Sequence, residues 1–182
     1  MNSPALDSTA PEAESRLERM IARLVTQRAL LGHVAGLVGD RPGPILEIGL
    51  GKGRTYSHLE NLFRARSIWA FDFEVHAPAH SRPADDRIIT GDFRESLKSC
   101  WPTIGAAPVF VHADIGTESR KADADLARFV GGVTAGNLAD GGYLMGDRDM
   151  AAEGLVQIER PDVSLPAGIT AWPYFLYRRA DR

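Results

Sequence analysis

A glycine-rich segment follows a short apolar run of the chain. It contains Gly49, Gly51 and Gly53, and Glu47 stands two residues ahead of the first glycine. Glycine allows sharp backbone turns and lets a ligand approach without a side chain in the way. The dinucleotide pattern G-x-G-x-x-G, counted from the first glycine, would need a glycine where Arg54 stands. The segment therefore predicts a cofactor loop that favours a nucleoside joined to an amino acid over a pyrophosphate.

The pattern Glu47-x-Gly49-x-Gly51-x-Gly53 resembles motif I of the class I S-adenosylmethionine-dependent methyltransferases. The order of predicted elements is similar over residues 44–146. This resemblance implies a Rossmann-like fold, S-adenosylmethionine as the cofactor and methyl transfer as the reaction. An unpaired carboxylate on a buried strand is costly. We therefore expect Glu47 to accept hydrogen bonds from loop amides or from the ammonium group of the cofactor.

A carboxylate ends the next predicted strand. Asp72 follows the glycines by about twenty residues, where an acidic side chain can accept hydrogen bonds from both ribose hydroxyls. The resemblance assigns Asp72 that role, and Glu74, two residues further on, is a rival for it. An aspartate after a strand can also be only a helix cap or a turn residue.

A second acidic position ends the third predicted strand, in the sequence Gly91-Asp92-Phe93. The resemblance implies that Asp92 accepts a hydrogen bond from the amino group of adenine. Phe73 and Phe93 would then lie on either side of the ring. The alternatives are that Asp92 caps the following helix and that both phenylalanines belong to the core.

Methyl transfer from a sulfonium is an in-line displacement, so the protein has to align donor and acceptor and, for an oxygen or nitrogen acceptor, remove a proton. In a doubly wound sheet the reacting atoms lie beyond the carboxyl ends of the central strands. Asp114 follows one such strand, and His112 lies within it. We expect Asp114 or His112 to be the base, although a hydrogen-bonded core histidine is the favoured interpretation of His112.

Asp114 and Asp147 also suggest a metal site. The surrounding segments, residues 111–114 and 141–147, resemble a subgroup of small-molecule O-methyltransferases. That resemblance implies a divalent metal on the two aspartates, and oxygen ligands suit Mg²⁺. Arg148 stands where the pattern has an asparagine ligand and would repel a cation, though Asp149 could substitute. We therefore expect no metal, with Asp114 binding substrate or capping the next helix and Asp147 paired with Arg148.

Short apolar runs alternate with helical stretches along most of the chain. Strands are predicted at residues 45–48, 67–71, 87–90, 108–113 and 142–146, and helices at residues 55–66, 93–101 and 118–138. This alternation is typical of a parallel sheet covered by helices on both faces. Two further strands, at residues 155–159 and 171–178, would close one edge as an antiparallel hairpin. The predicted fold is a doubly wound α/β three-layer sandwich with a seven-stranded, mostly parallel sheet.

An added helix precedes this sheet. From residue 12 to residue 38, apolar residues recur at three- and four-residue steps, with charged residues such as Arg23 between them: Leu17, Met20, Ile21, Leu24, Leu31 and Val34. This pattern predicts an amphipathic helix packed on the core, with a dimer face as the alternative. The expected organisation is a single domain over residues 1–182, with a frayed tail at residues 1–11 and the added helix at residues 12–40.

Composition restricts the class of protein. A hydrophobic fraction of 44% in 182 residues is enough for one core. The formal charge of −3 gives no general attraction to nucleic acid or anionic lipid, so neither is expected as a partner. Cys100 is the only cysteine, which excludes an intrachain disulfide and indicates a reducing cytoplasm. No apolar run is long enough to span a membrane, and the first residues lack a secretory signal.

The short connecting segments leave little room for a recognition domain. We therefore expect a small-molecule acceptor, partly enclosed by a neighbouring subunit if the chain forms a homo-oligomer. A nicotinamide-dependent oxidoreductase of similar topology is one alternative, disfavoured by Arg54 and by the absence of a Tyr-x-x-x-Lys pair. A non-catalytic protein that binds S-adenosylmethionine or S-adenosylhomocysteine is the other, and the glycine loop permits it equally well.

Overall fold

A seven-stranded sheet forms the centre of the molecule, for which a computed structural model describes residues 15–116 and 119–181. Its strands are β1 (Ile45–Ile48), β2 (Ile68–Asp72), β3 (Ile88–Thr90), β4 (Phe110–Ala113), β5 (Tyr143–Gly146), β6 (Leu155–Gln157) and β7 (Phe175–Arg179). Their spatial order is β3-β2-β1-β4-β5-β7-β6. The first five strands pair in parallel, whereas β7 pairs antiparallel with both β5 and β6. The predicted mostly parallel sheet with an antiparallel C-terminal pair is confirmed.

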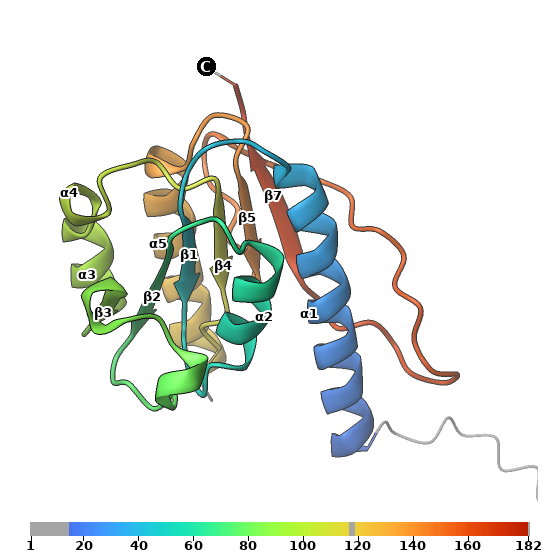
Figure 1. Ribbon diagram of the computed structural model, residues 1–182. Coiled ribbons are helices and arrows are strands. Elements are labelled where there is room, and N and C mark those ends of the chain that lie inside the picture. The colour runs from blue at the N-terminus through green and yellow to red at the C-terminus, as the bar shows by residue number, and fades with distance from the viewer. Residues whose placement is uncertain (1–14, 117–118, 182) are drawn as a thin grey trace, which may run out of the picture.

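Helices cover both faces of this sheet (Figure 1). On one face lie α1 (Arg16–Val38) and α2 (Arg54–Leu62), and on the other lie α3 (Phe93–Ser99), α4 (Trp101–Ile104) and α5 (Arg120–Asn137). Two short 3₁₀ helices, Ala79–Ser81 and Asp85–Arg87, connect β2 to β3. The three-layer, doubly wound arrangement predicted from the alternation of strands and helices is therefore confirmed.

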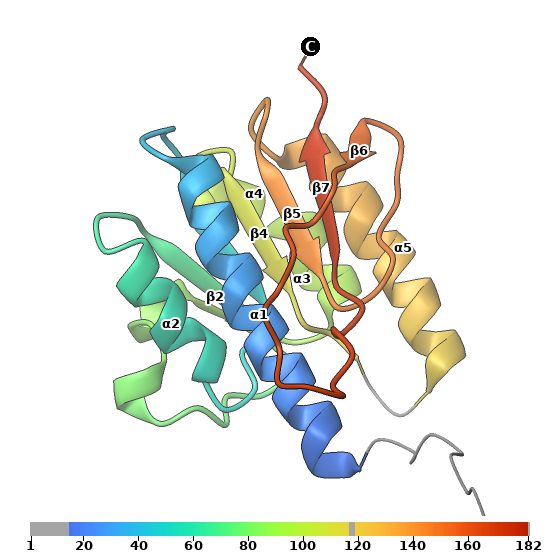
Figure 2. The same ribbon diagram turned by 90° about the vertical axis from the view of Figure 1, so that its right-hand side faces the viewer.

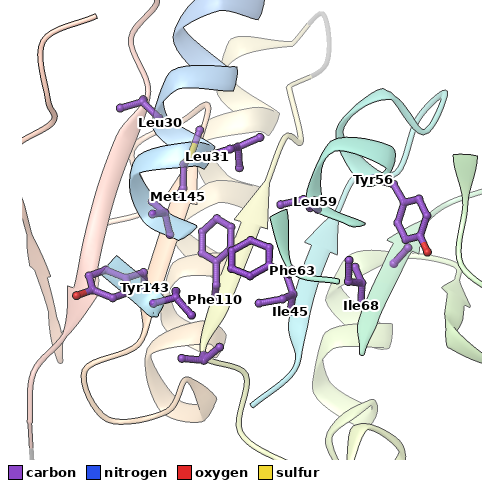
Figure 3. Close-up of a cluster of buried hydrophobic side chains, with 14 of the residues drawn as sticks. Leu30, Leu31, Ile45, Tyr56, Leu59, Phe63, Ile68, Phe110, Tyr143 and Met145 are labelled. Carbon is purple, nitrogen blue, oxygen red and sulfur yellow. The ribbon is translucent and has the colours of Figure 1, made fainter. Parts of the chain in front are cut away.

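Two apolar clusters fix the helices on the sheet. On the face of α1 and α2, Leu30 and Leu31 pack with Phe63 and Phe110, whose ring centroids lie 5.9 Å apart (Figure 3). On the opposite face, side chains of α3 and α5 pack on the alternate residues of the same strands. Because both faces of the central strands are buried, a polar residue within β1 or β4 lies inside the core.

The added helix α1 has a capped beginning. The Ser15 backbone N–H donates to Glu18 Oε2 at 2.6 Å, and the Glu18 N–H donates to Ser15 Oγ at 3.2 Å, which forms a reciprocal capping box. The helix ends at Val38, as predicted, where Gly39 takes a positive φ of 51°. The predicted start at residue 12 and the predicted tail at residues 1–11 lie outside the described residues.

Several predicted boundaries differ from the structure. The helix predicted over residues 55–66 ends at Leu62, because Phe63 leaves helical geometry and its ring enters the core. The helix predicted over residues 93–101 is two short helices that meet at Cys100. The last strand begins at Phe175 and not at residue 171, since the preceding segment runs along α1 (Figure 2), where the Trp172 N–H donates to Thr26 Oγ1 at 3.2 Å.

No helix within residues 15–116 and 119–181 combines the length and the apolar character that a bilayer crossing requires.

Candidate functional site

The glycine loop lies at the carboxyl end of β1, beside the first turns of α1 (Figure 1). Gly49 and Gly53 both have positive φ, and a Cβ at either position would overlap a backbone carbonyl oxygen, of Asp114 or Ser81 respectively. Gly51 also has positive φ, but its missing Cβ would meet nothing within 4 Å. Two glycines are therefore required by close backbone contacts, while the middle one leaves open space in which a ligand can lie.

Asp72, at the end of β2, is bonded to this loop. Its Oδ2 accepts from the Gly51 N–H at 2.6 Å and its Oδ1 accepts from the Phe73 N–H at 2.7 Å. Glu74, the rival acidic residue, lies next to His76, with 3.7 Å between Oε2 and Nε2, and its side chain is 68% exposed. Of the two candidates, Asp72 is the one in contact with the glycine loop.

A cavity of about 390 Å³ opens beside the end of β3. Phe73, Gly91, Asp92 and Phe93 line it together with residues of α5. Asp92 is also the N-cap of α3, since its Oδ1 accepts from the Arg94 N–H at 2.7 Å. Phe73 is 69% exposed. The structure thus brings together all four residues that the sequence assigns to an adenine site, and it shows the capping role of Asp92 as well.

A second cavity, of about 330 Å³, lies between α1, the glycine loop and the end of β4. Gly51 and Asp114 are among its lining residues. Asp72 links residues of the two cavities, because it accepts from Gly51, which lines the second cavity, and from Phe73, which lines the first. A larger cavity, of about 770 Å³, lies elsewhere, around Pro44 and Ser67 at the amino ends of β1 and β2.

Asp114, the predicted base, is held by α1. Arg23 Nη2 donates to both of its carboxylate oxygens, at 2.5 and 2.7 Å, and Gln27 Nε2 donates to Oδ2 at 3.2 Å. Burial raises the pKa of Asp114, but the neighbouring His112 and Arg23 lower it by more. The resulting pKa of Asp114 therefore lies below its ordinary value. Arg23 and Gln27 are site residues that sequence reasoning missed.

Their position in α1 explains why. Arg23 and Gln27 fall in the same helical stripe as the buried Leu30 and Val34, although the sequence pattern suggested that Arg23 belongs to the charged face. Near the beginning of the helix, three apolar side chains are instead exposed, by 67%, 55% and 42% at Leu17, Met20 and Leu24. The sequence signal that could have identified them is their spacing: Arg23 and Gln27 are polar residues four positions apart, in line with the buried Leu30 and Val34.

His112 and Glu47 lie beneath α1 with no exposed surface. His112 Nε2 is 3.3 Å from Gln27 Nε2, and burial lowers the pKa of the imidazole to about 4. Neither Glu47 oxygen has a hydrogen-bond partner among the described residues. Burial, with the nearby carboxylates of Asp114 and Asp72, raises the pKa of Glu47 well above its usual range. The core therefore favours the neutral form of both side chains.

The expected amide partners of Glu47 bond elsewhere. The N–H groups of Gly49 and Leu50 donate to the carbonyl oxygen of Phe71, at 2.9 and 3.1 Å, and the Gly51 N–H donates to Asp72. A buried carboxyl without a partner is costly unless another donor reaches it. The ammonium group of a bound cofactor is the remaining partner among those expected from the sequence.

Asp147 is buried and paired with its neighbour. Arg148 Nη1 donates to Asp147 Oδ2 at 2.8 Å, and Arg148 Nη2 donates to Asp123 Oδ2 at 3.1 Å. Burial and the nearby Asp114 raise the pKa of Asp147 to about 6. Asp149 accepts from the Tyr177 hydroxyl at 2.6 Å. In the part of the chain that the structure describes, no three His, Cys, Asp or Glu side chains are grouped as metal ligands.

Comparison with known proteins identifies the family. Residues 14–179 match the family described as S-adenosyl-L-methionine methyltransferase. The chain belongs to this family. Its fold is that of the class I, Rossmann-like members, and the methyl donor of the family is S-adenosyl-L-methionine. No match was found among curated proteins.

Solved structures support the same assignment. An S-adenosyl-L-methionine methyl transferase from Silicibacter pomeroyi DSS-3 is 36% identical, with a TM-score of 0.79 over 92% of this chain and 100% of that one. TrmN from Thermus thermophilus is 17% identical, with a TM-score of 0.59 over 92% of this chain and 55% of that one. A probable spermidine synthase from Corynebacterium glutamicum ATCC 13032 is 14% identical, with a TM-score of 0.56 over 86% of this chain and 63% of that one. The last two similarities show the shared fold alone.

Proposed function

We propose that this methyltransferase transfers the methyl group of S-adenosylmethionine to a small-molecule acceptor bound between α1 and the glycine loop. The observation that carries this proposal is that Asp72 bonds both to Gly51, which lines one cavity, and to Phe73, which lines the other. One cavity has an aromatic wall and suits a nucleoside base. The other contains Asp114, the only carboxylate among its described lining residues, and an acceptor there can meet the methyl group.

We propose that the cofactor is held by the residues that the family motif marks. Asp72 would accept hydrogen bonds from the ribose hydroxyls, and Asp92 from the adenine amino group. Gly91, Phe73 and Phe93 would enclose the base. The methionyl end would lie over Gly49, Gly51 and Gly53, where Glu47 offers its unpartnered carboxyl to the ammonium group. The bound cofactor supplies a methyl group on a cationic sulfur.

Asp114 is the proposed base, and His112 is the alternative. Asp114 lines the cavity, with a side chain that is 17% exposed, so a proton on an acceptor atom there can reach its carboxylate. His112 is fully buried and contacts Gln27. If Asp114 is the base, His112 would instead help to orient Gln27 and, through Gln27, Asp114.

We propose that catalysis requires no metal ion, because Arg23 and Arg148 already neutralise Asp114 and Asp147. The alternative is Mg²⁺ held by these two aspartates after the arginines move away. Treatment with EDTA is expected to leave the rate unchanged. Loss of activity that Mg²⁺ restores would favour the metal-dependent mechanism.

Transfer of labelled methyl groups tests the proposed function. The protein is incubated with methyl-labelled S-adenosylmethionine and a panel of small hydroxyl, amine and carboxyl compounds, with RNA as a separate arm. Label is expected in a small molecule, together with S-adenosylhomocysteine. Label in RNA alone would contradict a small acceptor. Cofactor binding without transfer to any acceptor would favour the non-catalytic binding protein, and reduction of NAD⁺ would favour the oxidoreductase.

We also propose a single domain in a reducing cytoplasm. The sheet is continuous from β3 to β6, and both apolar clusters pack on it. Cys100 is buried and is the only cysteine of the chain. One cooperative unfolding transition and recovery in the cytosolic fraction are expected. Two separate transitions, or recovery outside that fraction, would contradict these proposals.

A further inference from the structure

The cavity between α1 and the glycine loop is rich in cations. Arg23, Lys52 and Arg54 line it, and Asp114 is the only carboxylate among the lining residues that the structure describes. Lys52 and Arg54 are exposed, and within the described part of the chain neither takes part in an ion pair. Once Arg23 is counted against Asp114, Lys52 and Arg54 remain as two positive charges among the described lining residues. An anionic ligand would find complementary charge there.

Arg23 is suited to bind such a ligand directly. Its side chain is 39% exposed, and its guanidinium carbon lies 5.9 Å from the centre of the Trp172 ring. A single nitrogen, Nη2, makes both contacts with Asp114. A guanidinium has five N–H donors and pairs well with carboxylate or phosphate oxygens. Arg23 can therefore exchange Asp114 for an anionic group that enters the cavity.

The same cavity has an apolar side. Met20 and Leu24 lie one turn apart on α1, line the cavity and are 55% and 42% exposed. Leu50, which is buried at the base of the glycine loop, also reaches it. Large apolar side chains exposed beside a concave polar site are typical of a surface that covers the apolar part of a ligand.

We propose that the methyl acceptor is an anionic small molecule with an apolar portion, and that α1 recognises it. Its carboxylate or phosphate group binds Arg23 with Lys52 and Arg54, and its apolar portion contacts Met20 and Leu24. This inference rests on the proposed function and names the acceptor class for the same site.

Binding of the anion has a consequence for the reaction. When the acceptor's anionic group takes Arg23, Asp114 Oδ1 is released to receive the proton of the acceptor's hydroxyl or amine, while Oδ2 keeps the hydrogen bond from Gln27. The acceptor atom then forms a bond to the methyl carbon while the carbon–sulfur bond of the sulfonium breaks. The electron pair of that bond stays on sulfur, which gives neutral S-adenosylhomocysteine, a methylated acceptor and a protonated Asp114.

Calorimetry with matched ligands tests this inference. The full-length protein is saturated with S-adenosylhomocysteine and titrated with pairs that differ in charge: 3-phenylpropanoate against 3-phenylpropanamide, hexanoate against hexanamide, and phenyl phosphate against phenol. At least one anion is expected to bind at least tenfold more tightly than its neutral partner. The carboxylate and phosphate arms then distinguish the two kinds of anion. If no anion binds more tightly than its neutral partner, the inference is wrong.

Substitutions on α1 identify the responsible residue. In Arg23→Gln the preference for the anion is expected to fall at least fivefold, while the affinity for S-adenosylhomocysteine stays within threefold of the parent. Arg19→Gln, on the exposed side of the same helix and outside the cavity, is the matched control and should keep the preference. Loss of S-adenosylhomocysteine binding in folded Arg23→Gln would mean that the cation serves the cofactor, which would overturn the inference.

Failure of the proposed function gives a different result. If the parent protein does not bind S-adenosylhomocysteine at all, both proposals are wrong. If it binds S-adenosylhomocysteine but shows no preference for anions, only the acceptor class is wrong.

Discussion

Glu47 of β1 and His112 of β4 are register partners on adjacent parallel strands, and neither has any exposed surface. Both side chains lie on the face of the sheet that α1 covers. Both Glu47 oxygens and His112 Nδ1 lack hydrogen-bond partners among the described residues. Burial raises the pKa of the carboxyl and lowers that of the imidazole. Two neutral titratable groups therefore lie side by side under the proposed acceptor cavity, and each makes stability depend on pH.

His112 should make the protein less stable as the pH falls. The unfolded chain binds a proton at the ordinary histidine pKa near 6.5, whereas the folded protein binds it only near 4. The free energy of unfolding should therefore decrease as the pH falls from about 6.5 to about 4, by roughly 3 kcal/mol in total. Urea unfolding of the parent and of His112→Asn from pH 4 to pH 7.5 measures this effect.

The difference between the two proteins isolates the histidine, because Asp147, with its pKa raised to about 6, contributes the opposite slope in both. Equal slopes for the parent and for His112→Asn would show that the imidazole is not buried in its neutral form.

Glu47 should act in the opposite direction. Its pKa is raised by burial and by Asp114 and Asp72, so its stabilising contribution is complete below the ordinary carboxyl pKa and is lost as the pH rises. Glu47→Gln keeps the neutral shape, so at pH 8 it should be more stable than the parent by at least about 1 kcal/mol. Thermal unfolding at pH 5 and pH 8 measures this. The prediction would be contradicted if, from pH 5 to pH 8, the stability of the parent rose relative to that of Glu47→Gln.

Asp72 and Asp92 should each matter for cofactor affinity. A hydrogen bond to a charged acceptor contributes about 1.5–3 kcal/mol, so Asp72→Ala and Asp92→Ala should each weaken S-adenosylmethionine binding at least tenfold. Calorimetry measures both, with Glu74→Ala as the control. A larger loss in Glu74→Ala than in Asp72→Ala would transfer the ribose role to Glu74. Parent-like affinity in both Asp72→Ala and Asp92→Ala would show that the cofactor lies elsewhere.

Asp114→Asn should separate binding from chemistry. The amide cannot take up a proton, so the rate of methyl transfer should fall by about 10²- to 10⁴-fold, while the affinity for S-adenosylmethionine stays within threefold. The rate of S-adenosylhomocysteine formation, with whichever acceptor the methyl-transfer screen identifies, measures this. Asp162→Asn, on the exposed C-terminal segment, is the matched surface control. An unchanged rate in Asp114→Asn would exclude Asp114 as the base.

The sequence was sufficient for the parts of the site that depend on local pattern. The glycine spacing predicted the loop, and in the structure the strand ends bring Asp72 beside Gly51 and place Asp92 in one cavity with Phe73. Each of these residues is close in the chain to the strand that positions it. Periodicity within a single element was therefore enough to predict them.

The contribution of α1 could not be read in the same way. Arg23 contacts Asp114 across 91 residues of sequence, and its role depends on how α1 is rotated on the sheet. The helix pattern alone assigned Arg23 to the charged face, because Met20 and Leu24 on either side of it looked like core residues. In the structure these two side chains are partly exposed at the cavity, and the inward stripe continues through Gln27.

The path of the C-terminal segment also could not be predicted from the local sequence pattern. The strand predicted from residue 171 begins only at Phe175, because the Trp172 backbone is bonded to Thr26 of α1 and not to the sheet. A contact between residues 146 positions apart leaves no periodic signal in the sequence.

Isothermal calorimetry of the purified protein with S-adenosylmethionine and S-adenosylhomocysteine, with NADH as the comparison, tests the central claim most directly. Micromolar binding of the first two, without binding of NADH, is the predicted result. It would place the family cofactor on this chain and justify the acceptor experiments. A folded protein that binds neither S-adenosylmethionine nor S-adenosylhomocysteine would contradict the proposed methyl transfer.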